Sequence, residues 1–181
     1  MKELTSGNPA KVIFAFSVPI IIGNLFQQLY SMIDTIIVGR TIGVDAIAAL
    51  GSTSYISTLI IGFMSGLTNG FSIITARHYG AGDSVKMRRS VAGTIIIGLV
   101  VSAILTVSSI FFIKPFMHLL NTPADIFDEA YSYISVTLFF MVTAMLYNMS
   151  AGVLRAVGDS ITPLVFLIIS SAMNVGLDIL F

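Results

Sequence analysis

The sequence predicts an all-α, multi-spanning membrane protein, and three observations support this fold class. Hydrophobic residues make up 56% of the 181-residue chain and charged residues only 10%, against about 25% charged residues in a typical soluble domain. The apolar residues gather in stretches about as long as the roughly 20 residues that a helix needs to cross a bilayer. The segments between them carry most of the charged and turn-forming residues. A soluble fold of this size could not cover so much apolar side chain, because much of its surface must face water.

Five apolar stretches are long enough to cross the membrane, and we expect each to form a helix. They cover residues 12–38, 47–75, 91–113, 131–154 and 162–181. The first is longer than the roughly 7–15 apolar residues of a signal peptide and lacks a small-residue cleavage pattern, so it is predicted as a spanning helix. The fifth stops at Phe181 without a polar flank. We therefore expect residues 1–181 to be a fragment of a longer protein.

Local signals support the second, third and fourth helices. The second carries small residues at every fourth position over residues 54–70, a stripe on which another helix could pack closely. Arg88 and Arg89 mark the cytoplasmic start of the third helix. Thr122 and Pro123 precede the fourth and are typical of a helix start, with a capping hydroxyl and a first-turn proline.

The distribution of Lys and Arg predicts the orientation of the chain, because cytoplasmic loops carry an excess of both residues. Alternate connectors divide the nine Lys and Arg residues seven to two. The seven are Lys2, Lys11, Arg77, Lys86, Arg88, Arg89 and Arg155, and the two are Arg40 and Lys114. We therefore expect a multi-pass protein of the inner (cytoplasmic) membrane, surrounded by lipid, with its N-terminus in the cytoplasm.

Composition and motifs also limit the function. The formal net charge is zero, so no overall field favours nucleic acid or an acidic partner. Cysteine is absent, which excludes a disulfide framework and a thiolate metal site in these residues. The sequence contains no P-loop, HExxH or serine-elbow motif. We expect neither an enzyme nor an organic cofactor.

Two acidic residues, Asp34 and Asp178, lie inside the predicted spans. A carboxylate in the bilayer core costs about 2.5–3.5 kcal/mol on insertion scales, so such residues usually face a cavity or a partner. The first and fifth helices are expected to run in the same direction, and both carboxylates come late in their helices. A pair at matched depth can share a proton or a monovalent cation such as Na⁺. The alternative for each is an aspartate at a helix end that faces interfacial water.

Polar neighbours favour a cation site at this pair. Asn174 precedes Asp178 by four residues and Tyr30 precedes Asp34 by four, which places each on the face of its aspartate. Tyr133 is expected at a similar depth in the fourth span. Oxygen atoms of these types suit a hard cation.

Three further features of the spans have two interpretations each. Gln27 and Asn148 are candidate cavity-lining residues, together with Tyr30, but interhelical hydrogen bonds would also account for them. Pro19 removes one backbone hydrogen bond within the first span. It predicts either a fixed bend or a hinge that responds to the charge on Asp34.

Motifs in five places, in order, resemble those of the multidrug and toxic compound extrusion (MATE) transporters. They are Gly7-Asn8-Pro9 with Pro19, then Gln28, Tyr30 and Asp34 leading to Gly39-Arg40-x-x-Gly43, then Arg77-His78-Tyr79-Gly80-Ala81-Gly82, then Arg155-Ala-Val-Gly158-Asp159-x-x-x-Pro163, and finally Asn174-x-x-x-Asp178. The resemblance extends over the whole chain. It implies twelve helices in two six-helix lobes around a central cavity, of which this chain would supply about five helices of the N-terminal lobe. Helix six and the C-terminal lobe would be absent.

The resemblance also implies a site and an activity. Asp34, Asp178, Asn174 and Tyr133 match the N-lobe cation site of the branch that resembles bacterial DinF proteins, and Pro19 matches its helix-one proline. The implied function is export of organic cations and other amphipathic drugs in exchange for H⁺ or Na⁺, for which this fragment alone would be insufficient. A lipid-linked sugar flippase of the same superfamily, a non-transporting membrane scaffold subunit and an intramembrane enzyme are the alternatives. The absence of Lys and Arg from the five spans argues against the flippase.

Overall fold

The computed structural model describes residues 8–180, except for the side chains of Asp178 and Ile179. Six helices follow one another in the described part of the chain. They are α1 (Pro9–Thr41), α2 (Val44–Gly80), α3 (Ser84–Leu119), α4 (Phe127–Phe139), α5 (Met141–Ala156) and α6 (Ile161–Leu180). Residues 8–180 contain no strand, so the predicted all-α class is confirmed.

α1 begins at a capped end and continues through Pro19. The side chain of Asn8 accepts a hydrogen bond from the backbone N–H of Ala10 at 3.0 Å, and Pro9 takes a first-turn position where its missing N–H costs nothing. The helix then runs unbroken for 33 residues, or about 50 Å. Pro19 therefore lies inside a continuous helix, and its role as a hinge stays a prediction.

The connection between α2 and α3 is a tight turn at one end of the bundle. Gly82 has a φ of +71°, in the left-handed region that glycine adopts without strain. Asp83 then caps α3 by accepting a hydrogen bond from the backbone N–H of Lys86 at 2.9 Å, and its carboxylate also lies 2.9 Å from the Lys86 ammonium. These two interactions, the backbone one first, lower the pKa of Asp83 below its ordinary value.

The fourth predicted span, over residues 131–154, is two helices rather than one. α4 ends at Phe139 and α5 begins at Met141, with a bend of 46° between them. No proline or glycine lies at the break; instead the hydroxyl of Thr106 in α3 donates to the carbonyl of Leu138 at 3.4 Å. A side chain that enters the hydrogen-bond ladder of a helix is a recognised cause of a kink. Because Thr106 belongs to another helix, the sequence of the span itself could not predict the bend.

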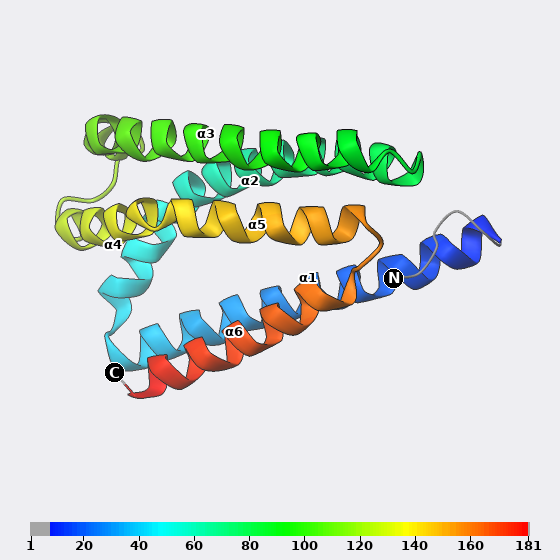
Figure 1. Ribbon diagram of the computed structural model, residues 1–181. Coiled ribbons are helices and arrows are strands. Elements are labelled where there is room, and N and C mark those ends of the chain that lie inside the picture. The colour runs from blue at the N-terminus through cyan, green and yellow to red at the C-terminus, as the bar shows by residue number, and fades with distance from the viewer. Residues whose placement is uncertain (1–7, 181) are drawn as a thin grey trace.

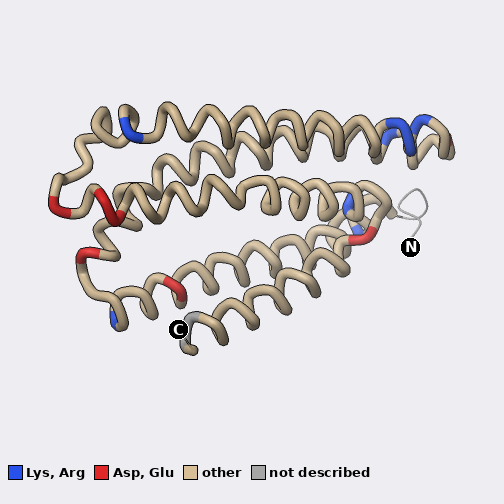
Figure 2. Tube along the Cα trace, turned by 60° about the vertical axis from the view of Figure 1, so that its left-hand side comes forward, with Lys and Arg blue, Asp and Glu red and all other residues tan. Residues whose placement is uncertain are grey.

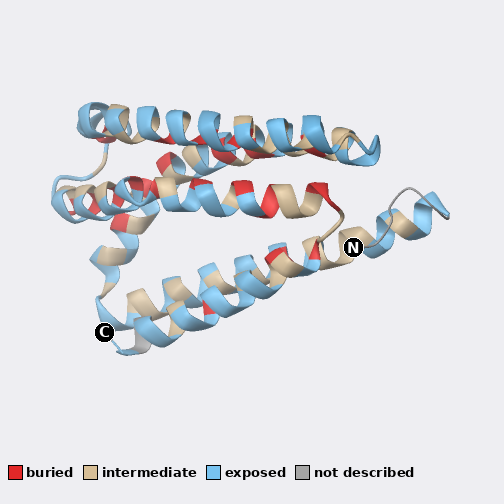
Figure 3. Ribbon diagram, in the orientation of Figure 1, coloured by how far each residue is buried: buried red, intermediate tan, exposed pale blue. Residues whose placement is uncertain are grey.

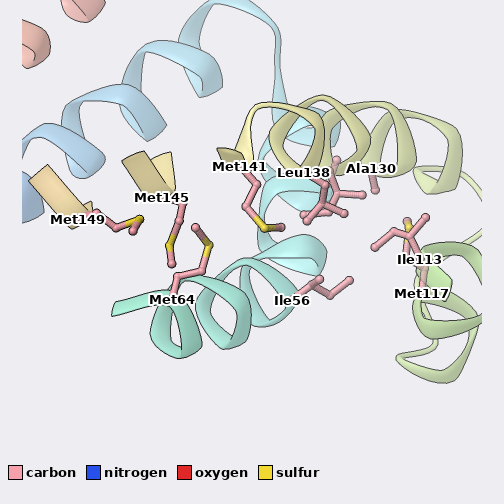
Figure 4. Close-up of a cluster of buried hydrophobic side chains, with 11 residues drawn as sticks. Ile56, Met64, Ile113, Met117, Ala130, Leu138, Met141, Met145 and Met149 are labelled. Atoms are coloured by element: carbon pink, nitrogen blue, oxygen red, sulfur yellow. The ribbon is translucent and has the colours of Figure 1, made fainter. Parts of the chain in front are cut away.

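The helices form two groups (Figure 1). α1 and α6 lie side by side and run in the same direction, while α2, α3 and the α4–α5 pair pack against one another. The buried core belongs to the second group and is rich in methionine, including Met64, Met141, Met145 and Met149 (Figure 4). Flexible thioether side chains fill irregular space of this kind well. The α1–α6 pair thus stands beside the core, joined to it by α1–α2 and α5–α6 contacts.

The outer surface suits a bilayer. α1, α2 and α3 are each long and apolar enough to cross a membrane, and the bent α4–α5 pair meets the same test when it is counted as one span. α6 contributes a shorter apolar segment. Exposed residues cover the outward faces of the helices (Figure 3), and many of them are large and hydrophobic. Lys and Arg lie near the helix ends, and long stretches without either residue separate them (Figure 2).

Candidate cation site between α1 and α6

A glycine allows α1 and α6 to approach closely. Gly23 is the one buried residue among those described in α1. A Cβ atom at this position would lie 3.5 Å from Leu164 and 3.7 Å from Leu167, both in α6. The two helices are therefore in van der Waals contact at this level, and small residues at such contacts are typical of helix packing in membranes.

A second contact, farther along the same pair, is polar. The phenolic hydroxyl of Tyr30 in α1 donates a hydrogen bond to the Oδ1 atom of Asn174 in α6 at 2.6 Å, and both residues are half-buried. Because α1 and α6 run in the same direction, the contacts at Gly23 and at Tyr30 define one parallel register. The structure thus brings together two of the residues that the sequence singled out.

The two aspartates follow these residues by one helical turn. Asp34 comes four residues after Tyr30 in α1, and its side chain is half-buried. Asp178 comes four residues after Asn174, within α6, but its side chain lies outside the described residues. The predicted approach of the two carboxylates therefore stays a prediction.

The other candidate residues do not join the Tyr30–Asn174 pair. Tyr133 lies on α4, which packs against α2, α3 and α5 and, among the described residues, does not touch α1 or α6; its side chain is 44% exposed. Gln27 is exposed on α1. Asn148 donates its amide N–H to the carbonyl of Ala144 in its own helix at 2.9 Å, so this bond is not an interhelical one.

The start of α6 is anchored by a cap and by a bond to α5. Asp159 accepts hydrogen bonds from the backbone N–H groups of Ile161 and Thr162 at 3.1 and 3.0 Å and from the Thr162 hydroxyl at 2.6 Å. The hydroxyl bond, followed by the Thr162 backbone bond, lowers the pKa of Asp159 below its ordinary value. The hydroxyl of Tyr147 in α5 also donates to the carbonyl of Pro163 at 3.4 Å. These bonds thus hold the N-terminal end of α6 in place where the helix begins to pack against α1.

A small-cation site at Asp34 and Asp178 stays a prediction. Within the described part of the chain, no three His, Asp or Glu side chains gather as a metal ion would require. Gly23 was not among the site residues predicted from the sequence. Its position inside the apolar span that carries Asp34 was the signal that could have indicated it.

A family model identifies the family of the chain. The family model described as MatE matches residues 19–180. The chain belongs to the MatE family. The resemblance noted in the sequence motifs is therefore confirmed by a match over most of the chain. The MatE match and the long apolar helices make this a multi-pass membrane protein.

Curated relatives and a solved structure agree with the MatE assignment. The protein named "Probable multidrug resistance protein YoeA" of Bacillus subtilis (strain 168) is 30% identical over 162 residues, which cover 90% of this chain and 35% of that protein. "Probable multidrug resistance protein YpnP" of the same strain is 29% identical over 179 residues, covering 99% of this chain and 40% of that protein. A crystal structure described as MATE in the bent conformation matches with a TM-score of 0.87 at 27% identity, covering 95% of this chain and 38% of that chain. This MatE chain thus spans less than half the length of the relatives it matches.

Proposed function

We propose that the MatE protein represented by this chain is a secondary active exporter that exchanges H⁺ or Na⁺ for organic cations and other amphipathic drugs. The observation that carries the proposal is the hydrogen bond between Tyr30 and Asn174, which joins α1 to α6 one helical turn before Asp34. Relatives named as multidrug resistance proteins support the substrate class. The other lobe of the transporter would come from the rest of a longer protein.

The α1–α6 pair supplies a means of coupling the cation to a conformational change. In the proposed site Asp34 and Asp178 share one H⁺ or Na⁺, with Tyr30 and Asn174 beside it. Occupation by the cation removes the repulsion between two carboxylates and favours a close approach of α1 and α6. Loss of the cation restores the repulsion, and α1 then moves relative to α6 with Pro19 as its hinge. Alternating access follows if cation and drug bind preferentially to opposite-facing states.

The charge pattern favours a cationic over an anionic substrate. Lys and Arg lie near the ends of the helices, and the lengths between them lack both residues (Figure 2). A flippase for an anionic lipid-linked sugar would need cations along its central cavity. The exporter is therefore the better supported of the two transporter hypotheses.

Replacement of Asp34 by Asn tests the proposal. Asparagine keeps the size of the side chain and much of its hydrogen bonding but cannot change charge. In the full-length protein we expect Asp34→Asn to abolish ethidium efflux from loaded cells, normalised to protein in the membrane. Asp45→Asn, at an exposed aspartate in the first turn of α2, is the matched control and should keep efflux. Wild-type efflux from Asp34→Asn would return Asp34 to a structural role and favour the scaffold alternative.

A further inference from the structure

A crevice between α3 and α4 lies apart from the α1–α6 pair. Its volume is about 210 Å³. Ser109 and Ile113 line it from α3, and Tyr131, Ser135 and Phe139 line it from α4. Drug-sized ligands usually occupy pockets of about 300–1,000 Å³. The crevice is therefore large enough for only one part of a bigger amphiphile, such as one chain of a lipid.

The bend in the fourth span and two small side chains keep this crevice open. α3 continues as one helix past the bend, whereas the chain turns by 46° between α4 and α5. Ser109 and Ser135 fill little space, and the Ser109 hydroxyl already donates to the carbonyl of Leu105 at 2.7 Å. Most of the accessible lining is apolar. Water is poorly held in such a space, so in a bilayer an acyl chain is the natural occupant.

The crevice runs from headgroup depth into the hydrocarbon. Lys114 directly follows the apolar run 91–113 of α3, which spans about 35 Å as a helix and so matches the roughly 30 Å hydrocarbon core. Lys114 thus lies at headgroup level. Thr106, at the other end of the crevice, comes eight residues earlier in the same helix, about 12 Å deeper. This geometry suits a molecule with a polar head at Lys114 and an apolar chain below it.

The charged residues at the headgroup end of the crevice suit a zwitterionic lipid headgroup. The ammonium of Lys114 lies 4.6 Å from the ring centroid of Tyr131, and no described carboxylate lies within ion-pair distance of it. Asp128 comes three residues before Tyr131, on the same face of α4 and one turn farther out. With Asp125 and Glu129 it makes this end acidic. A purely anionic headgroup would be repelled here, whereas a phosphate at Lys114 followed by an ammonium at Asp128 would be accommodated.

We propose that the α3–α4 crevice binds one phosphatidylethanolamine molecule. Its phosphate contacts Lys114, its ammonium contacts Asp128, and one acyl chain lies between α3 and α4 against Phe139. The site is separate from the proposed cation site, so its test does not depend on transport.

The absence of tryptophan from the chain makes a direct test practical. Trp is missing from all 181 residues, so Phe139→Trp places the first tryptophan of these residues in the crevice. Any Trp in the rest of the longer protein is replaced by Phe. The purified protein is reconstituted into phosphatidylcholine vesicles in which an increasing share of the lipid is a brominated-chain phospholipid. Bromine quenches tryptophan on contact, so quenching measures occupancy of the crevice by each headgroup class. Phe166→Trp, at an exposed position on α6, is the control fluorophore.

In the Phe139→Trp variant we expect brominated phosphatidylethanolamine to be preferred over brominated phosphatidylcholine by about five-fold, the size of one added hydrogen bond. The ammonium of phosphatidylethanolamine has N–H groups that can donate to Asp128, whereas the choline group has none. The control variant Phe166→Trp should show no preference. Added to Phe139→Trp, Asp128→Asn should abolish the preference, whereas Lys114→Gln should weaken quenching by both lipids because they share the phosphate. Lys114→Arg and the same-end control Arg40→Gln should leave both the preference and the quenching unchanged. Equal quenching by the two lipids, stronger quenching by phosphatidylglycerol, or a preference that survives Asp128→Asn would each overturn the proposal. If Lys114→Gln loses its helical circular dichroism, the exposed Asp128→Asn variant decides.

Discussion

Tyr30 on α1 donates its phenolic hydroxyl to the amide oxygen of Asn174 on α6 at 2.6 Å, across 144 residues of sequence. The bond joins the first and last helices of the described chain. Both residues are half-buried, so the bond forms where water competes less for its donor and acceptor. The bond fixes the register of α1 against α6 one helical turn before Asp34.

Removal of either partner should weaken the α1–α6 contact. We expect Tyr30→Phe and Asn174→Ala each to lower the free energy of unfolding by about 1 kcal/mol, with a coupling energy of about 0.5–1.5 kcal/mol between them. The measurement is a double-mutant cycle by denaturant titration in detergent. Fully additive effects would mean that the two side chains do not interact in solution.

The two aspartates should act as one unit in transport. If Asp34 and Asp178 share one cation, loss of either carboxylate already destroys the site. The Asp34→Asn/Asp178→Asn double variant should then export ethidium no worse than either single variant. Efflux from cells expressing equal amounts of full-length protein measures this. The opposite result would show two independent sites. In that case each single variant keeps partial efflux, and the loss of efflux in the double variant is the product of the two single losses.

Close packing between α5 and α2 should make Gly152 intolerant of a side chain. A Cβ atom at this buried glycine would meet the Ser72 hydroxyl and lie 3.0 Å from a methyl carbon of Thr68. We expect Gly152→Ala to destabilise the protein by about 1–3 kcal/mol, measured as a shift in the denaturant midpoint. Gly62→Ala in α2 is the control, because no described side chain or neighbouring helix lies within 4 Å of its Cβ position. That variant should be neutral or stabilising by up to about 1 kcal/mol through helix propensity.

The cap at Asp159 should stabilise α6 in a pH-dependent way. Asp159→Ala should cost about 0.5–2 kcal/mol of stability at neutral pH. The hydrogen bonds of Asp159 hold its pKa below the ordinary value of 3.8, so the carboxylate contribution is present above that value. It is lost as the pH falls through the lower folded-state pKa. Asp159→Asn, which keeps a capping oxygen without a charge, should retain most of the neutral-pH stability and lose the acid dependence; unfolding curves across acidic pH compare the three proteins.

The asymmetry of Lys and Arg predicts which end of the bundle faces the cytoplasm. Residues 1–181 contain no cysteine, so an introduced Cys is a unique labelling site once any Cys in the rest of the longer protein is replaced by Ser. In intact cells a membrane-impermeant thiol reagent should label Lys114→Cys but not Lys86→Cys, because the positive end stays inside. External labelling at Lys86→Cys would reverse the predicted topology.

The sequence by itself determined the all-helical membrane class and the family. Both depend on local properties, because each spanning helix satisfies its own backbone hydrogen bonds and needs only a sufficient apolar run. Spacing alone also placed Tyr30 and Asn174 one turn before the two aspartates. The helix ends were harder to predict from the sequence. α3 covers Ser84–Leu119, whereas its apolar run covers only residues 91–113, because the polar turns at its ends remain helical outside the hydrocarbon.

Only the tertiary structure decided which predicted residues meet. The stripe of small residues in α2 was expected to pack against a helix, but within the described chain nothing lies within 4 Å of a Cβ position at Gly62, Gly66 or Gly70. Tyr133 lies on a helix that does not contact α1 or α6 among the described residues, and the bend between α4 and α5 lies beside a hydroxyl from α3. Each outcome depends on how one helix is rotated and placed against another. That choice is made by interhelical packing and hydrogen bonds, which the periodicity of a single helix does not specify.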